Sequence, residues 1–200
     1  MSKPRSTLPN PVESVANLTS ALAQIGAEVD NQPLRSSALA RIMRKTFHGS
    51  DAGGAWDWRM AYDLMQAAAV QVLLRGDGAA GDIAAAKLLA SRLLTETRRS
   101  EQQIRLQQFS TPLPFAALVL RAAAIRRGET VLEPSAGNGA LAAFATRAGG
   151  TLLLNEIDPF RQRLLRAVFG GEVTGHDGEH IDDLLQTPVL PDVVVMNPPF

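Results

Sequence analysis

The 200-residue sequence contains no cysteine, which excludes disulfide bonds and thiolate metal ligands. It carries no excess of charge, because 20 basic side chains balance 20 acidic ones. A global electrostatic attraction to nucleic acid is therefore excluded, although a local basic patch is not. There is no apolar run of about 18 residues and no apolar segment typical of a secretory signal. We expect a cytoplasmic protein with no membrane span.

The residues that are present divide the chain into three parts. Residues 1–12 are rich in Pro, Ser and Asn, and we expect a disordered leader. Residues 13–108 are dominated by Ala, Leu, Arg and Gln without alternating strand patterns, which predicts an all-α region. Residues 109–200 alternate short apolar runs with helical stretches, which predicts an α/β domain.

The all-α region is expected to contain helices over residues 13–29, 34–47, 58–75 and 82–98. Asp57 is a plausible N-cap of the third helix. On that helix five side chains recur at three- and four-residue spacing and form one apolar face: Trp58, Tyr62, Met65, Ala69 and Val72. The Trp56 and Trp58 pair is expected to anchor a helical core, with base stacking as the alternative.

Four strands are expected in the α/β part, over residues 130–133, 151–155, 172–174 and 192–196. They are continuous apolar runs separated by helical segments. This pattern is typical of a parallel sheet covered on both faces by helices.

A glycine loop follows the first expected strand and opens a helix. Gly137 and Gly139 allow a tight turn and a close approach of the backbone to a ligand. The alternatives are a plain β–α turn and a dinucleotide loop, in which Ala142 would replace the third glycine. Glu133, directly before the loop, is unusual for a pyrophosphate site, and its carboxylate suits a cationic ligand instead.

Acidic residues follow the next two expected strands. Glu156 lies where a nucleoside-binding sheet places an acceptor for ribose hydroxyls. Asp158 and Pro159 resemble the start of the next helix, and the alternative is that both acids only cap that helix. Asp177 is a candidate acceptor for an adenine amino group, or else part of a solvated Asp-Gly turn.

No metal site is expected, because His176 and His180 have no third ligand nearby in the sequence.

The last four residues, Asn197, Pro198, Pro199 and Phe200, form a stiff loop after the fourth expected strand. The Asn197 side-chain oxygen and the Pro198 carbonyl can bind the hydrogens of a conjugated amine and draw its nitrogen toward tetrahedral geometry. Phe200 can stack on a flat ring. Orientation and hydrogen bonding would then promote the reaction without a tuned base. The alternative is a structural proline-rich loop.

These motifs resemble those of class I methyltransferases that use S-adenosylmethionine. Residues 133–139 (EPSAGNG) are similar to motif I, residues 197–200 (NPPF) to motif IV of DNA adenine-N6 methyltransferases, and residues 109–112 (FSTP) to the segment that contacts the cofactor's methionine part. The resemblance implies a Rossmann-like methyltransferase sheet, of which we expect the first four strands. The expected cofactor contacts are Thr111, Pro112, Glu133, Pro134, Ala136, Gly137, Gly139, Glu156, Ile157 and Asp177.

The all-α region and the segment that follows it resemble a narrower family. Residues 54–58 (GAWDW), 97–101 (TRRSE) and 107–112 (QQFSTP) are similar to the N-terminus of bacterial and phage strawberry-notch-type methylase/helicase proteins. The resemblance implies DNA as substrate and a helicase region in cis. No Walker A sequence occurs in these residues. Because the expected strands are fewer than the usual seven, we expect the 200-residue chain to be inactive in methyl transfer alone.

Three functions are compatible with these motifs. The first is methyl transfer to adenine N6 in DNA, and the second is the same chemistry on cytosine N4 or on a protein glutamine amide. The third is a non-catalytic module that engages DNA for a helicase. Its candidate phosphate contacts are arginines: Arg98, Arg99, Arg105, Arg126, Arg127, Arg161, Arg163 and Arg166. A solvated helix face is the alternative for these arginines.

Overall fold

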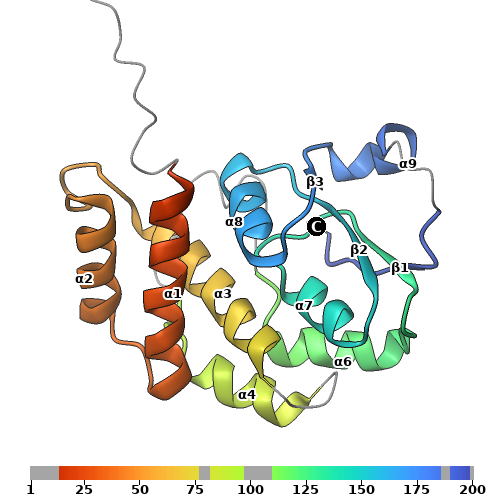
Figure 1. Ribbon diagram of the computed structural model, residues 1–200, viewed down its shortest axis with the longest axis horizontal. Coiled ribbons are helices and arrows are strands. Elements are labelled where there is room, and N and C mark those ends of the chain that lie inside the picture. Colours follow the sequence, from red (N-terminus) through yellow and green to blue (C-terminus); the bar gives the residue numbers. More distant parts are fainter. Residues whose placement is uncertain (1–13, 77–81, 97–109, 186–189, 199–200) are drawn as a thin grey trace, which may run out of the picture.

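The computed structural model describes residues 14–76, 82–96, 110–185 and 190–198. The chain begins with four helices, α1 (Val15–Asn31), α2 (Ser36–Phe47), α3 (Trp58–Arg75) and α4 (Ile83–Ser91). Helix α3 lies between α1 on one side and the sheet region on the other (Figure 1). The leader expected over residues 1–12 lies outside the described residues. None of the described helices is long and apolar enough to cross a membrane.

Helix α3 begins and ends where its sequence predicts. The Asp57 side chain accepts a hydrogen bond from the Met60 backbone N–H at 2.7 Å, which caps the first turn. Tyr62 and Met65 on the predicted apolar face are buried. Trp56 is buried too and donates its indole N–H to the Gly49 carbonyl at 3.0 Å, so its predicted role as a core anchor is confirmed.

Helix α4 is shorter than the predicted segment 82–98, because it ends at Ser91. Arg92 is recruited by another part of the fold. Its carbonyl accepts from the Leu34 N–H at 2.8 Å, and its guanidinium donates to the Val29 carbonyl at 3.1 Å near the end of α1. These tertiary hydrogen bonds replace the next helical turn.

The α/β part contains α6 (Leu113–Ala123), β1 (Thr130–Glu133), α7 (Ala140–Arg147), β2 (Thr151–Asn155), α8 (Pro159–Phe169), β3 (Val173–Thr174), the 3₁₀ helix η2 (Gly178–His180), α9 (Ile181–Leu184) and β4 (Val193–Val194). The four strands form one sheet in the order β3-β2-β1-β4, and every pair is parallel. The α/β class and the four-stranded parallel sheet are confirmed. The order is compatible with a Rossmann-like fold.

The crossover helices α7 and α8 both pack on one face of the sheet. Val131, Val193 and Val195 point into the core on that side. Val194 points to the opposite face and is 47% exposed. Helices were predicted on both faces of the sheet, but α7 and α8 cover only one of them. Strand β4 is also shorter than predicted, because its hydrogen bonding to β1 stops where the Val195 N–H meets the Leu132 carbonyl.

The larger of two hydrophobic clusters among the described residues runs through both the helical region and the sheet region. Leu64 of α3, Phe144 of α7 and Leu164 of α8 are fully buried in the same cluster. The core therefore crosses the boundary that the sequence predicts between residues 108 and 109. Through Asp63 and Arg59, α3 also bonds to residues that follow β1 and β2, Asn138 and Asp158.

Candidate functional site

Two predicted loops leave neighbouring strands at the same edge of the sheet. Residues 134–139 follow β1 and residues 195–198 follow β4, and these strands are hydrogen-bonded to each other. In the order β3-β2-β1-β4 the chain changes direction across the sheet between β1 and β4. Open α/β sheets bind ligands at such a switch point, outside the carboxyl ends of the strands. A ligand site is therefore expected between the two loops.

A small pocket lies between these loops and helix α3. Its lining residues are Gln66, Val70, Ser110, Thr111, Ser135, Ala136, Gly137, Asn138, Ala140 and Asn197. Four of the predicted site residues are thus brought together: Thr111, Ala136, Gly137 and Asn197. The enclosed volume is about 20 Å³, which is room for about one water molecule. Any larger ligand must extend from this pocket along the open edge of the sheet.

The two predicted glycines of the loop have different roles. Both have positive φ, +56° at Gly137 and +85° at Gly139. A Cβ at Gly139 would lie 2.6 Å from the ring of Phe169, so this glycine is required by packing between the loop and α8. A Cβ at Gly137 would meet no atom within 4 Å. Gly137 therefore presents bare backbone to open space at the pocket.

Asn197 is held by Thr111, although the two residues are far apart in the sequence. The Asn197 amide nitrogen donates to the Thr111 hydroxyl at 3.1 Å, which turns the amide oxygen away from Thr111. Thr111 does not cap the following helix, because α6 has Pro112 as its N-cap. Asn197 and Pro198 are exposed. The predicted Pro199 and Phe200 lie outside the described residues.

Glu133 is buried at the end of β1, with 3% of its surface exposed. Its Oε2 atom has no hydrogen-bond partner among the described residues. Burial raises the pKa of this carboxyl well above its usual value; the Ala142 backbone N–H works in the opposite direction, and the nearby charge of Glu156 raises the pKa further. A cation reaching this carboxylate would reverse the effect.

Glu156 holds the glycine loop from the end of β2. Its two carboxylate oxygens accept from the Gly137 N–H at 2.7 Å and the Asp158 N–H at 2.8 Å. Burial raises its pKa, although these backbone N–H groups and the charge of Arg161 oppose the shift. Ile157, next in sequence, is 49% exposed. Glu156 does not cap α8, so that alternative is wrong for this residue.

Asp158 is the N-cap of α8, as predicted. Its Oδ1 accepts from the Phe160 and Arg161 N–H groups at 2.8 and 3.1 Å. Its other oxygen is paired with the Arg59 guanidinium of α3. Burial works against ionisation of this carboxyl, but the hydrogen bonds from Arg161 and Arg59 outweigh it and lower the pKa.

A buried polar network connects α3 to the glycine loop and was not predicted. Asp63, 2% exposed, accepts from the Asn138 amide at 2.9 Å and forms an ion pair with Arg161 at 2.9 Å. The Asn138 amide also donates to the Ser110 hydroxyl at 3.0 Å. Arg161 is therefore a buried structural cation, and its expected availability for phosphate contacts is wrong.

Asn155 at the end of β2, which the sequence did not single out, joins the loops that follow β1 and β3. It is 1% exposed, and its amide donates to the Pro134 carbonyl at 2.8 Å and the His176 carbonyl at 2.9 Å. Its oxygen accepts from the His176 N–H and the Thr174 hydroxyl. The sequence marks it only as a polar residue ending an apolar strand.

Asp177 lies in the loop that Asn155 holds. It is exposed, and its carboxylate caps η2 by accepting from the Glu179 N–H at 3.1 Å. It does not line the small pocket. No cluster of three metal-ligating side chains occurs within the described part of the chain.

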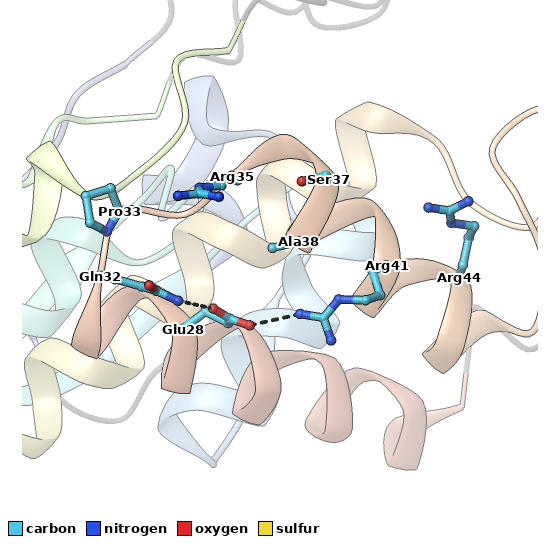
Figure 2. A pocket seen from close by; sticks show the side chains of 8 residues that line it. All are labelled: Glu28, Gln32, Pro33, Arg35, Ser37, Ala38, Arg41 and Arg44. Carbon is cyan, nitrogen blue, oxygen red and sulfur yellow. Dashed lines mark hydrogen bonds and ion pairs between the residues drawn. The ribbon is translucent and has the colours of Figure 1, made fainter.

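A second hollow of about 500 Å³ lies far from this edge, between α1 and α2. Figure 2 shows Glu28 bonded to both Gln32 and Arg41, while Arg35 and Arg44 stand on either side of this cluster. Three arginines and one glutamate thus line this groove. We call it the arginine groove.

Comparison with known protein families, curated proteins and solved structures finds no match. The site is therefore interpreted from its own geometry.

Proposed function

We propose that this chain carries the cofactor site and the catalytic motif of an S-adenosylmethionine-dependent amino-methyltransferase that acts on adenine N6 in DNA. The observation that carries the proposal is the meeting of Asn197, Thr111 and the glycine loop around one pocket at the switch point of the sheet. Three motifs spread over the 86 residues from Thr111 to Asn197 converge there, which a chance Pro-rich loop does not explain.

The charges near the loop support a cationic cofactor. Among the described residues, four carboxyl groups are buried here, Asp63, Glu133, Glu156 and Asp158, and two guanidinium groups pair with them, Arg59 and Arg161. S-adenosylmethionine has a sulfonium and an ammonium group, and its net charge is positive. The surplus of carboxylates would favour it over the neutral product, S-adenosylhomocysteine.

The cofactor would extend along the open edge of the sheet. Its amino-acid end would occupy the small pocket beside Gly137, whose missing side chain allows close approach. The ribose would lie over Glu156 and the adenine against the exposed side chain of Ile157. The Asp177 carboxylate would have to weaken its hydrogen bond with the Glu179 N–H in order to accept one from the adenine amino group.

The chemistry proposed for Asn197 uses the orientation of its amide. Because the nitrogen donates to Thr111, the oxygen is the end that faces a target amine. This oxygen and the Pro198 carbonyl would accept the hydrogens of the target amine and orient its nitrogen. S-adenosylmethionine, when bound, would supply the methyl group: the S–C bond would break as the N–C bond forms, and the surplus proton of the amine would leave to solvent. Phe200 would stack on the flipped base.

Calorimetric titration of the cofactor tests the proposal. We expect S-adenosylmethionine to bind the wild-type chain and the Asn197→Ala variant alike, since Asn197 is assigned to the target amine. Methylation of adenine-containing DNA by the whole protein, followed with tritiated cofactor, should be lost in the same variant. Absence of cofactor binding would sink the proposal. Methylation of cytosine N4 or of a glutamine amide instead would change the substrate but not the chemistry.

The arginine groove favours a second function, DNA engagement without catalysis. Arg35 and Arg44 have no carboxylate partner among the described residues, and only Arg41 is paired with Glu28. Backbone phosphates are the ligand class that such a groove attracts. Of the arginines expected for this role, Arg126 and Arg127 are exposed, whereas Arg98, Arg99 and Arg105 lie outside the described residues.

A salt titration of DNA binding separates the two functions. The double variant Arg35→Ala/Arg44→Ala should reduce the slope of log affinity against log salt by about 2, about 1 for each lost phosphate contact. The double variant Lys87→Ala/Arg121→Ala removes the same charge from exposed positions on α4 and α6 and serves as the control. Equal slopes in the two variants would argue against the groove.

A further inference from the structure

Helix α3 presents a stripe of three residues to the glycine loop. Asp63, Gln66 and Val70 are spaced by three and four residues, so they share one face of the helix. Gln66 and Val70 line the small pocket together with Asn138 and Asn197. Asp63, one turn earlier, bonds to Asn138 itself. The helical region therefore supplies part of the wall of the site.

The bonding of Asp63 decides which end of the Asn138 amide faces the pocket. Both amide hydrogens of Asn138 are used, one by Asp63 at 2.9 Å and one by Ser110 at 3.0 Å. Its oxygen, in contrast, is buried without a hydrogen-bond partner in the described part of the chain. Asn138 is only 5% exposed, so this acceptor is desolvated and remains unsatisfied. A ligand that donates a hydrogen bond would satisfy it.

Gln66 offers a second acceptor on the same side. Its amide nitrogen donates to Glu96 at 3.4 Å, which turns the side-chain oxygen away from Glu96. Ser135 adds a buried hydroxyl without a partner among the described residues. The pocket thus combines amide oxygens from α3 and from the loop, a set that suits an ammonium group better than a carboxylate.

We propose that α3 is part of the cofactor site, with Asp63 as a positioning residue for the glycine loop and Gln66 as a ligand contact for an ammonium group. This inference rests on the proposed function, in which the ammonium belongs to the amino-acid end of S-adenosylmethionine. Its consequence is that α3 and the sheet form one binding unit. The helical region is then needed for cofactor affinity as well as for packing.

The ligand-contact part is tested by a matched pair of glutamine variants on α3. Gln66→Ala removes the proposed contact, whereas Gln71→Ala removes a glutamine of the same helix that bonds to Arg75 away from the pocket. Calorimetry with S-adenosylmethionine should show an affinity loss of about 3- to 10-fold for Gln66→Ala, as for one hydrogen bond, and none for Gln71→Ala. Equal affinities in the two variants would overturn the ligand contact.

The positioning part is tested on Asp63 without any ligand. In Asp63→Asn we expect faster hydrogen exchange of the amides of residues 137–139. The variant should also bind S-adenosylmethionine more weakly, at a temperature well below its own melting point. A purely structural Asp63 would lower the melting temperature and leave both readouts unchanged, which would overturn the positioning role. If Asp63→Asn does not fold, Asn138→Ala takes its place, with hydrogen exchange of the loop as its readout, because Asn138 is itself a proposed ligand acceptor.

Failure of the proposed function has a separate signature. If the wild-type chain does not bind S-adenosylmethionine, the proposed function and the Gln66 contact are both wrong. The exchange measurement on Asp63→Asn still decides whether α3 positions the loop.

Discussion

The two sides of the ligand edge are built differently. On the β1–β2 side, Glu133, Asn155 and Glu156 are all at most 4% exposed, and the last two are hydrogen-bonded to neighbouring loops. On the β4 side, Asn197 is exposed and is held by one hydrogen bond to Thr111. The chain therefore preorganises the side proposed for the cofactor. The side proposed for the target amine is open, as a surface that must admit a large substrate should be.

The largest expected effect comes from breaking the buried network on the cofactor side. Arg161→Ala leaves Asp63 buried without its closest cation, and we expect a loss of about 3 kcal/mol in the free energy of unfolding. The control is Arg41→Ala on α2, which breaks an exposed pair with Glu28 and should cost less than about 1 kcal/mol. Urea unfolding measures both losses. Equal losses would show that the buried network stabilises the fold no more than the exposed pair does.

The two glycines of the loop have different roles, since Gly139 is needed for packing and Gly137 for ligand access. Gly139→Ala places a methyl against Phe169 at positive φ, and we expect a loss of about 2–3 kcal/mol. Gly137→Ala meets open space, so only the positive φ costs, about 1 kcal/mol. Thermal unfolding measures the difference. Relative to the stability lost, Gly137→Ala should lower the affinity for the cofactor more than Gly139→Ala does. A greater relative loss of affinity in Gly139→Ala would contradict these roles.

The buried carboxyl of Glu133 predicts a pH dependence of stability. Its pKa is raised by burial in the folded chain, so between about pH 4.5 and the raised value the folded state holds one more proton than the unfolded state. Its contribution to stability is complete below pH 4.5 and falls by about 1.4 kcal/mol per pH unit as the pH rises through this window. Glu133→Gln should remove this slope and be more stable than wild type at neutral pH.

Urea unfolding from pH 4 to 8 measures the Glu133 effect. A difference between wild type and Glu133→Gln that does not grow with pH would contradict the assignment. The cofactor provides a sharper version of the test, because a cation favours the ionised carboxylate. Affinity for S-adenosylmethionine should therefore rise with pH in the wild type more steeply than in Glu133→Gln.

The smallest expected effect on stability lies on the β4 side. Thr111→Val keeps the shape of the side chain and removes the hydroxyl that accepts from Asn197, so we expect less than about 1 kcal/mol of lost stability. The Asn197 side-chain amide should nevertheless exchange its hydrogens faster, which NMR can follow. Thr111→Ser retains the hydroxyl and should behave like wild type. A loss as large as that of Arg161→Ala would remove the contrast between the two sides.

Much of the local structure was predictable because its causes are local. The cap of α3 by Asp57 and the limits of β1 and β2 follow from side-chain type and apolar runs. The end of α4 was not predictable, because Arg92 is recruited by Leu34 and by α1. In the site, Asp158 capped α8 as expected, whereas the bonding of Glu156 to Gly137 depends on the register of two strands.

The sequence by itself determined the glycine loop, the acidic residues at the strand ends and the motif at Asn197, and its composition excluded disulfides and thiolate metal sites. Each of these features can be recognised from composition or from a few neighbouring residues. Only the tertiary structure decided the strand order, the meeting of Thr111 with Asn197 and the reach of α3 into the pocket. These depend on long-range packing and on the pairing of buried charges, for which Asp63, Arg161 and Asn138 carry no mutual signal in the sequence. A buried carboxyl group is stabilised either by a cation or by holding its proton, and only the fold determines that Asp63 meets Arg161.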